Sequence, residues 1–164
     1  MGRKLLITTI ILTFCFSWVG CQKKDISSDI GKDNQEQKVN YRIIEPAELN
    51  EIDGVLMRIK PDTLTRTSAT IVIYDYTNED NIYGKAFHID KKENGEWVSL
   101  KPMTEVNWNL IGYHVDEHDR LELNIGWKDM YGALPNGEYR IVKDTSKQGE
   151  MENHYFSVQF IIES

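Results

Sequence analysis

The stretch that decides the fold is LPNGEYRIV, residues 134–142. It opens with Pro, Asn and Gly, the residues that favour a tight turn. From residue 138 to residue 144 it continues as a strand that begins with Glu, Tyr and Arg. Tyr139 lies early in this strand, so its hydroxyl is placed to bond back across the turn. The stretch therefore predicts a strand that is fixed at its start by a tyrosine corner.

Outward from this corner, the dominant sequence period is two. Residues 121–128, LELNIGWK, alternate apolar with polar or small side chains, and Ala69, Ile71 and Ile73 repeat the pattern. Alternation of this kind is typical of half-buried antiparallel strands, and Asn94-Gly95 supplies the positive φ angles of a hairpin turn. Further strands are expected at residues 55–60, 83–91, 96–100, 106–113 and 155–162.

Seven to nine short strands within residues 41–164 predict an all-β, antiparallel two-sheet sandwich. We expect Trp108 and Trp127 in its core, since a sandwich of this size commonly buries a Trp. Internal repeats and a second domain are not evident in the sequence.

Residues 127–143, WKDMYGALPNGEYRIVK, resemble the signature of a bacterial immunoglobulin-like domain family found in Firmicute surface lipoproteins. In that family a Tyr-Gly-x-Leu-x-x-Gly-x-Tyr-Arg-Ile pattern precedes the penultimate strand. Residues 54–55, 68–74 and 94–97 are similar to the upstream strands of the family, and the resemblance covers roughly residues 53–162. It implies an immunoglobulin-like sandwich and an envelope location, and it supplies no catalytic residues.

The first twenty residues predict a signal peptide. Arg3 and Lys4 precede an uncharged, largely apolar run that is shorter than a membrane-spanning helix requires. Gly20 before Cys21 resembles the lipobox of bacterial lipoproteins, although Trp18 stands where that pattern usually has Leu. We expect Cys21 to carry lipid and to hold the protein on the extracytoplasmic face of the cell membrane. A secretory signal cut elsewhere, or an uncleaved anchor, is the alternative.

Residues 21–40 predict a lipidated cysteine followed by a tether. Residues 22–40 contain three aliphatic side chains and no aromatic one, so they bury too little apolar surface to offset their conformational entropy. As a flexible coil, this segment would hold the domain on the order of 25 Å from the membrane.

Charge and cysteine usage exclude several functions. Without Arg3 and Lys4 the chain has 17 basic and 26 acidic side chains, a net charge of −9, which disfavours nucleic-acid binding. If Cys15 is removed and Cys21 is lipidated, the mature protein has no thiol for catalysis or for metal binding. No cofactor is expected.

Residues 114–118, HVDEH, match the H-x-x-E-H motif of one class of zinc peptidases. That motif requires a helix, because only there do positions i and i+4 share a face. Gly112 and the strand pattern that starts at Leu121 predict an acidic loop instead. The alternative function is a small metal-dependent hydrolase that uses residues 114–119. Weak metal candidates are His114, Asp116 and His118.

Residues 78–81, NEDN, offer oxygen ligands of the kind calcium takes, but they lack the spacing of a dedicated calcium loop. A polar connection between strands is the expectation.

Aromatic side chains predict a binding surface for a protein or glycan partner. If Ala69, Ile71 and Ile73 face the core, Tyr74 and Tyr76 share the outward face. Outward aromatics stack on sugars or anchor proteins, and the alternative is cross-strand pairing that only covers an edge. The predicted binding residues are Tyr74, Tyr76, Tyr83 and Trp97.

Together these features predict a lipid-anchored, extracytoplasmic, non-enzymatic binding or accessory module of the cell envelope. A second alternative, besides the hydrolase, is an envelope protease inhibitor that uses a loop.

Overall fold

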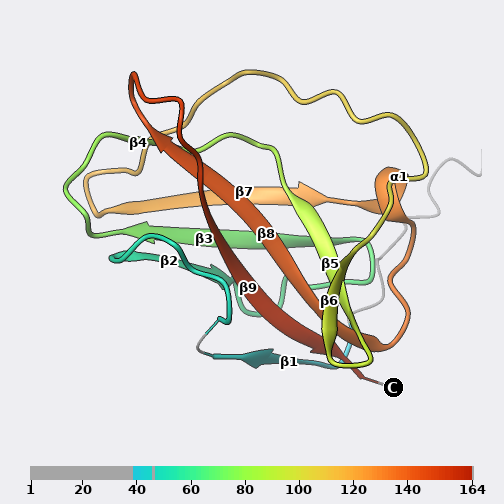
Figure 1. Ribbon diagram of the computed structural model, residues 1–164. Helices are drawn as coiled ribbons and strands as arrows, with labels where there is room; N and C mark the ends of the chain where they lie inside the picture. The colour runs from blue at the N-terminus through green and yellow to red at the C-terminus, as the bar shows by residue number, and fades with distance from the viewer. Residues whose placement is uncertain (1–38, 46, 164) are drawn as a thin grey trace, which may run out of the picture. The chain divides into compact units, whose positions relative to one another are not determined.

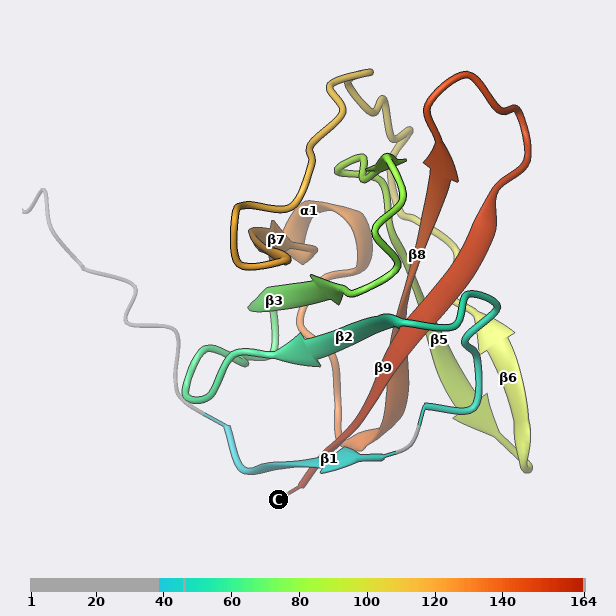
Figure 2. The same ribbon diagram turned by 90° about the vertical axis from the view of Figure 1, so that its left-hand side faces the viewer.

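The computed structural model describes residues 39–45 and 47–163, which form two antiparallel sheets that face each other (Figures 1 and 2). The predicted all-β sandwich of about seven to nine strands is confirmed, with nine strands in the described part. In chain order the elements are β1 (Tyr41–Ile44), β2 (Val55–Ile59), β3 (Ser68–Asp75), β4 (Asn81–Ile82), β5 (His88–Glu93), β6 (Glu96–Ser99), β7 (Arg120–Gly126), α1 (Lys128–Tyr131), β8 (Gly137–Lys147) and β9 (His154–Ile162).

The larger sheet has the strand order β1-β9-β8-β5-β6, and β4 pairs with β8 beside this path. The smaller sheet has the order β2-β3-β7. Its strands show the alternation read from the sequence: in β2 the odd-numbered Val55, Met57 and Ile59 are buried, while Leu56 and Arg58 are exposed. Side chains from the inner faces of both sheets meet in one core.

The tyrosine corner is confirmed. The Tyr139 hydroxyl donates a 2.9 Å hydrogen bond to the carbonyl of Pro135, and the buried ring stacks on Phe160 with centroids 5.8 Å apart. Gly137 allows this closure, because a Cβ there would lie only 3.3 Å from the Tyr139 ring. The corner therefore fixes where β8 starts.

Trp127 joins the end of the smaller sheet to this corner. Its indole is fully buried, as predicted, and donates a 2.8 Å bond to the Arg66 carbonyl. The Arg66 guanidinium in turn donates to the Leu134 carbonyl and to the Asn136 side chain, each at 2.7 Å. The segment between β2 and β3 is thus tied to the turn that precedes β8.

The turn between β5 and β6 forms where the sequence predicts it. Asn94 and Gly95 have φ angles of 52° and 89° and form the β5–β6 hairpin turn as predicted. The expected strand at residues 83–91 is present only in its second part, because β5 begins at His88 and residues 84–87 lie outside any strand. Among the described residues, α1 has only four residues, and no helix reaches the length and hydropathy of a membrane span.

Candidate functional site

A long loop, residues 100–119, connects β6 with β7 and passes over one end of the sandwich (Figure 1). The sequence predicted a strand at residues 106–113, and the structure shows that this is wrong. Val106, Trp108 and Leu110 alternate with polar residues, but in the described part of the chain this segment pairs with another only at the single bridge between Tyr113 and Tyr83. A connection of this length without regular structure is uncommon in compact domains and is usually functional.

The loop is attached at both ends. The Met103 N–H donates a 2.8 Å bond to the Met130 carbonyl, and Tyr113 exchanges two 2.9 Å bonds with Tyr83. Gly112 permits the close approach beside this bridge, because a Cβ there would collide with the side chain of Ile82. The backbone bonds of Met103 and Tyr113 therefore fix both ends of residues 104–112.

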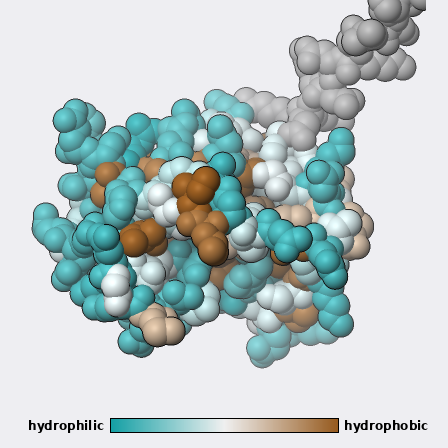
Figure 3. All heavy atoms as spheres, turned by 90° about the horizontal axis from the view of Figure 1, so that it is seen from above, coloured by the Kyte–Doolittle hydropathy of each residue, from teal (hydrophilic) through white to brown (hydrophobic). Residues whose placement is uncertain are grey.

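Apolar side chains gather at this end of the molecule. Of the nine large apolar side chains that are exposed in the described part, six belong either to the long loop or to the β8–β9 hairpin. One of the six, Met103, bonds to Met130 of α1 at the start of the loop and is set apart from the other five. Leu110 and Met151 are exposed over their whole surface. Seen from above, this end shows hydrophobic side chains surrounded by hydrophilic ones (Figure 3). We call these five residues the apolar end: Trp108, Leu110, Ile111, Met151 and Tyr155.

Trp108 separates two hollows at the apolar end. One hollow, of about 270 Å³, lies between Trp108, Phe87 and Tyr155. The other, of about 230 Å³, lies between Trp108, Leu110 and Asn153. The Trp108 ring packs on Phe87 with centroids 5.3 Å apart and is still 37% exposed, so the prediction of a core position for Trp108 was wrong. It is a surface residue held by one aromatic contact.

The segment below the long loop is fixed by β8. The fully buried Lys143 ammonium donates 2.7 Å bonds to the carbonyls of Gly84 and Ala86, and the Thr145 hydroxyl donates to the Ile82 carbonyl at 2.9 Å. Burial lowers the pKa of Lys143 to about 8, and the nearby Asp144 opposes this shift. These bonds hold residues 82–86 as a rigid base for the loop.

Tyr83 belongs to this base and not to a surface, which corrects the prediction. Its ring is fully buried, and its hydroxyl donates a 2.7 Å bond to Asp75, whose carboxylate also accepts from Asn81 at 2.9 Å. Burial and the Asp75 charge raise the pKa of Tyr83. Burial also tends to raise the pKa of Asp75, but hydrogen bonds from Thr77, Asn81 and Tyr83 outweigh it and leave that pKa below its ordinary value.

The other predicted aromatics lie on opposite sides of the sandwich. Tyr74 and Tyr76 stack with centroids 6.2 Å apart at the end of β3 in the smaller sheet, and Tyr76 is exposed. Trp97 lies on β6 in the larger sheet. The structure therefore does not bring the four predicted residues together into one surface.

Trp97 is already surrounded by charged groups. Its indole donates a 2.6 Å bond to Glu48, while Lys92 and Arg140 lie 5.0 and 4.8 Å from its ring centroid. The Lys92 ammonium also donates to Glu48 at 3.0 Å and to Glu138 at 3.1 Å. Hydrogen bonds from Trp97 and Lys92 lower the pKa of Glu48. The Trp97 ring therefore already interacts with two cations of the same chain.

The weak metal candidates do not form a site. Residues 114–119 contain a turn, in which Asp116 accepts the backbone N–H groups of His118 and Arg120 at 2.9 and 3.1 Å. These bonds lower the pKa of Asp116. His114 lies 3.2 Å from Asp80 instead. Within the described residues no three His, Cys, Asp or Glu side chains are grouped as metal ligands.

The polar segment 78–81 connects β3 with β4, and its side chains are used structurally. Asn81 bonds to Asp75 and to Thr77, and Glu79 lies 3.4 Å from Lys147. Cys21, the predicted lipidation site, lies outside the described residues.

Sequence reasoning missed Leu110, Ile111 and Met151 as surface residues. For Leu110 and Ile111 the available signal was a stretch of twenty residues, 100–119, that lies between two clear strand patterns and contains apolar side chains. Its short alternation was interpreted as a strand, although alternation does not show whether a partner strand exists.

The sequence matches a known protein family. The model of a family described as "Bacterial Ig-like domain" matches residues 51–160, which is more than half of the chain. No curated protein matches the sequence.

Proposed function

Because the chain belongs to the bacterial Ig-like domain family, we propose that it is a lipid-anchored, extracytoplasmic, non-enzymatic binding module of the cell envelope. The family suggests an extracellular accessory or binding module. We place the binding surface for a protein partner at the apolar end.

The single observation that carries this proposal is the gathering of exposed apolar side chains on a held loop and on the β8–β9 hairpin. Leu110 and Met151 give their entire surface to solvent, and Trp108 lines two hollows beside them. Scattered apolar residues are ordinary on a protein surface, but a contiguous group rimmed by polar side chains marks an interaction site. Aromatic residues held over hollows are typical of the centre of such sites.

Rigidity of the base supports the same proposal. The Lys143 and Thr145 bonds hold residues 82–86, and the Tyr83–Tyr113 bridge fixes the end of the loop. A surface that is ordered before its partner arrives loses less conformational entropy on binding.

The test is capture of envelope proteins by immobilised residues 22–164. The double variant Leu110→Ser/Met151→Ser is expected to lose the captured protein, because it removes apolar contact area. The matched control is Val98→Ser/Tyr76→Ser, which changes two exposed side chains elsewhere and should retain it. Loss of the captured protein with the control variant alone would place the partner at Val98 or Tyr76 and contradict the proposal.

The anchor has its own test. The predicted lipid on Cys21 requires its thiol, so Cys21→Ala is expected to release the protein from the membrane fraction. The comparison is fractionation of cells that express the wild-type or the variant chain. Membrane retention of the variant would favour an uncleaved anchor instead.

The protease-inhibitor alternative is favoured by one observation. Leu110 is fully exposed on a segment without regular structure, held between Met103 and Tyr113, and loops of this kind enter protease clefts. If the captured partner is a protease, its activity should fall when the wild-type chain is added and remain when Leu110→Ser is added.

A further inference from the structure

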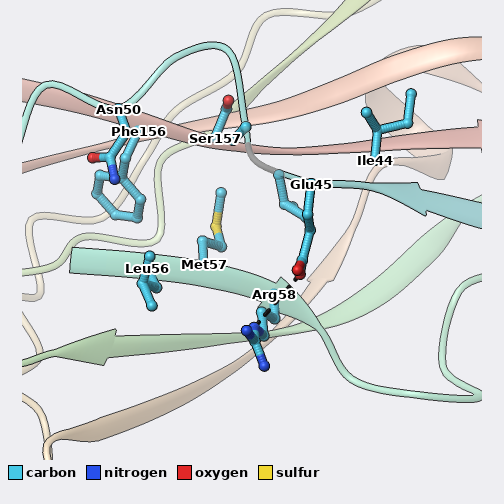
Figure 4. Close-up of a pocket in the computed structure, with 10 residues that line it drawn as sticks. Ile44, Glu45, Asn50, Leu56, Met57, Arg58, Phe156 and Ser157 are labelled. Carbon is cyan, nitrogen blue, oxygen red and sulfur yellow. Dashed lines mark ion pairs between the residues drawn. The ribbon is translucent and has the colours of Figure 1, made fainter. Parts of the chain in front are cut away.

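Two terminal strands border a groove along one side of the sandwich, away from the apolar end. β1 ends the larger sheet and β2 ends the smaller one (Figure 2). The groove between them has a volume of about 510 Å³ (Figure 4). Its apolar lining includes Met57, Phe156 and Val158, which are buried core residues. We call it the seam groove.

In the described part of the chain, some backbone N–H and C=O groups of β2 are unpaired and point toward the seam groove. The Tyr76 N–H donates to the Gly54 carbonyl at 2.9 Å, and the Lys60 N–H donates to the Thr70 carbonyl at 2.8 Å. In an antiparallel ladder this assigns the even-numbered residues of β2 to bonds with β3. The N–H and C=O groups of Met57 and Ile59 therefore point away from β3, and within residues 39–45 and 47–163 they have no partner.

β1 also has backbone N–H and C=O groups that point away from its paired strand. The Glu163 N–H donates a 3.0 Å bond to the Asn40 carbonyl, so the even-numbered residues of β1 bond to β9. The N–H and C=O groups of Ile43 point away from β9. The side of the sandwich thus carries two strand edges whose backbone groups are unused in the described part of the chain.

Two side-chain contacts span the groove. At one end the Asn50 amide donates a 2.9 Å bond to the Val55 carbonyl. Across its mouth Arg58 lies 3.6 Å from Glu45, and both side chains are 57% exposed (Figure 4). An exposed ion pair of this kind contributes little to stability, so a ligand can displace it at little cost.

We propose that the seam groove binds a single extended strand of a partner protein, which forms main-chain hydrogen bonds with β2. Unused strand edges are extended by such peptides, and side-chain pockets read alternate residues of the added strand. Apolar side chains of the ligand face Met57, Phe156 and Val158. Opposite β2 the wall of the groove is formed by Ile44, Glu45, Ala47 and Asn50.

The charges of the side chains beside the groove indicate which residues the bound strand carries at its outward positions. Glu45 lines the groove, and Glu51 and Asp53 are exposed on the segment that leads into β2, whereas Arg58 is the basic lining residue. Glu48 is not part of this wall, because it bonds to Lys92 and Trp97 of the larger sheet. Lys or Arg at the outward positions of the added strand therefore complements this wall, and Glu45 is freed for it when the pair with Arg58 opens. The ligand is a segment with alternating apolar and basic residues.

The probe is the peptide acetyl-Lys-Val-Lys-Val-Lys-Val-Lys-amide, added to residues 22–164. Binding should slow hydrogen exchange at the Met57 and Ile59 amides at least tenfold, measured by NMR. Methylation of every main-chain nitrogen of the peptide should abolish the effect. The proposal is overturned by absence of binding at millimolar peptide, or by equal binding of the methylated peptide.

A protein variant provides the second arm. Ala47 lines the groove and lies outside the buried core, so Ala47→Phe is expected to fill the groove and weaken binding at least tenfold. Ala133→Phe, at an exposed position elsewhere, is the matched control. Equal affinity of the Ala47→Phe and Ala133→Phe proteins would contradict the assignment to this groove.

The same exchange data identify other occupants. If the Met57 and Ile59 amides are protected without peptide, and Ile26→Asp/Ile30→Asp removes the protection, the occupant is the chain's own preceding segment. If protection rises with protein concentration, the occupant is a second copy. Either result overturns the proposal of a partner strand.

Discussion

At the scale of single residues, Lys143 at the base of the long loop makes the stability of the domain depend on pH. Its ammonium is buried, bonds to the carbonyls of Gly84 and Ala86, and has a pKa lowered by burial to about 8. The unfolded chain keeps this proton up to about pH 10.5, so between about pH 8 and 10.5 the unfolded state binds more protons than the folded state. The free energy of unfolding therefore rises with pH in this window.

The prediction compares the wild-type chain with Lys143→Met. The stability of the wild-type chain relative to the variant should increase between about pH 7.5 and 9.5, by at most about 1.4 kcal/mol per pH unit. Chemical denaturation at each pH measures this difference. Parallel pH profiles of the two proteins would show that folding does not lower the Lys143 pKa.

At the scale of elements, the long loop depends on its contact with β4. Gly112→Ala is expected to destabilise the domain by about 1–3 kcal/mol, because the added methyl group collides with Ile82 and displaces the Tyr113 bridge. Gly126→Ala on β7 is the control, since a Cβ there meets nothing within 4 Å. Equal stability of the two variants in thermal unfolding would contradict the close approach at Gly112.

Elements that rest on local chemistry were predictable from the sequence. Asn94-Gly95 specifies its hairpin turn, and the turn before Tyr139 specifies the corner, because their bonding partners lie within a few residues. The segment 106–113 was not predictable, since its alternation is compatible with a strand and only the tertiary fold shows that, among the described residues, its pairing is limited to the Tyr113–Tyr83 bridge. Tyr83 was misplaced for a similar reason, because its burial depends on Asp75 in the opposite sheet.

At the scale of the whole molecule, the sandwich separates two surfaces. The apolar end lies at the loops, and the seam groove lies along the side between β1 and β2. The sequence predicted the architecture, because alternation and turns are repeated through residues 41–164. It did not reveal either surface, since loop exposure and unused strand edges arise only when both sheets are assembled.

The central claim is that the apolar end contacts a protein partner in the envelope. Site-specific photo-crosslinking tests it most directly, with a benzophenone amino acid placed in living cells at Leu110, at Met151 or at the exposed Val98 on β6. We predict one discrete crosslinked species from Leu110 and Met151, and none from Val98. Crosslinking from Val98 alone, or equal crosslinking from all three positions, would contradict the claim.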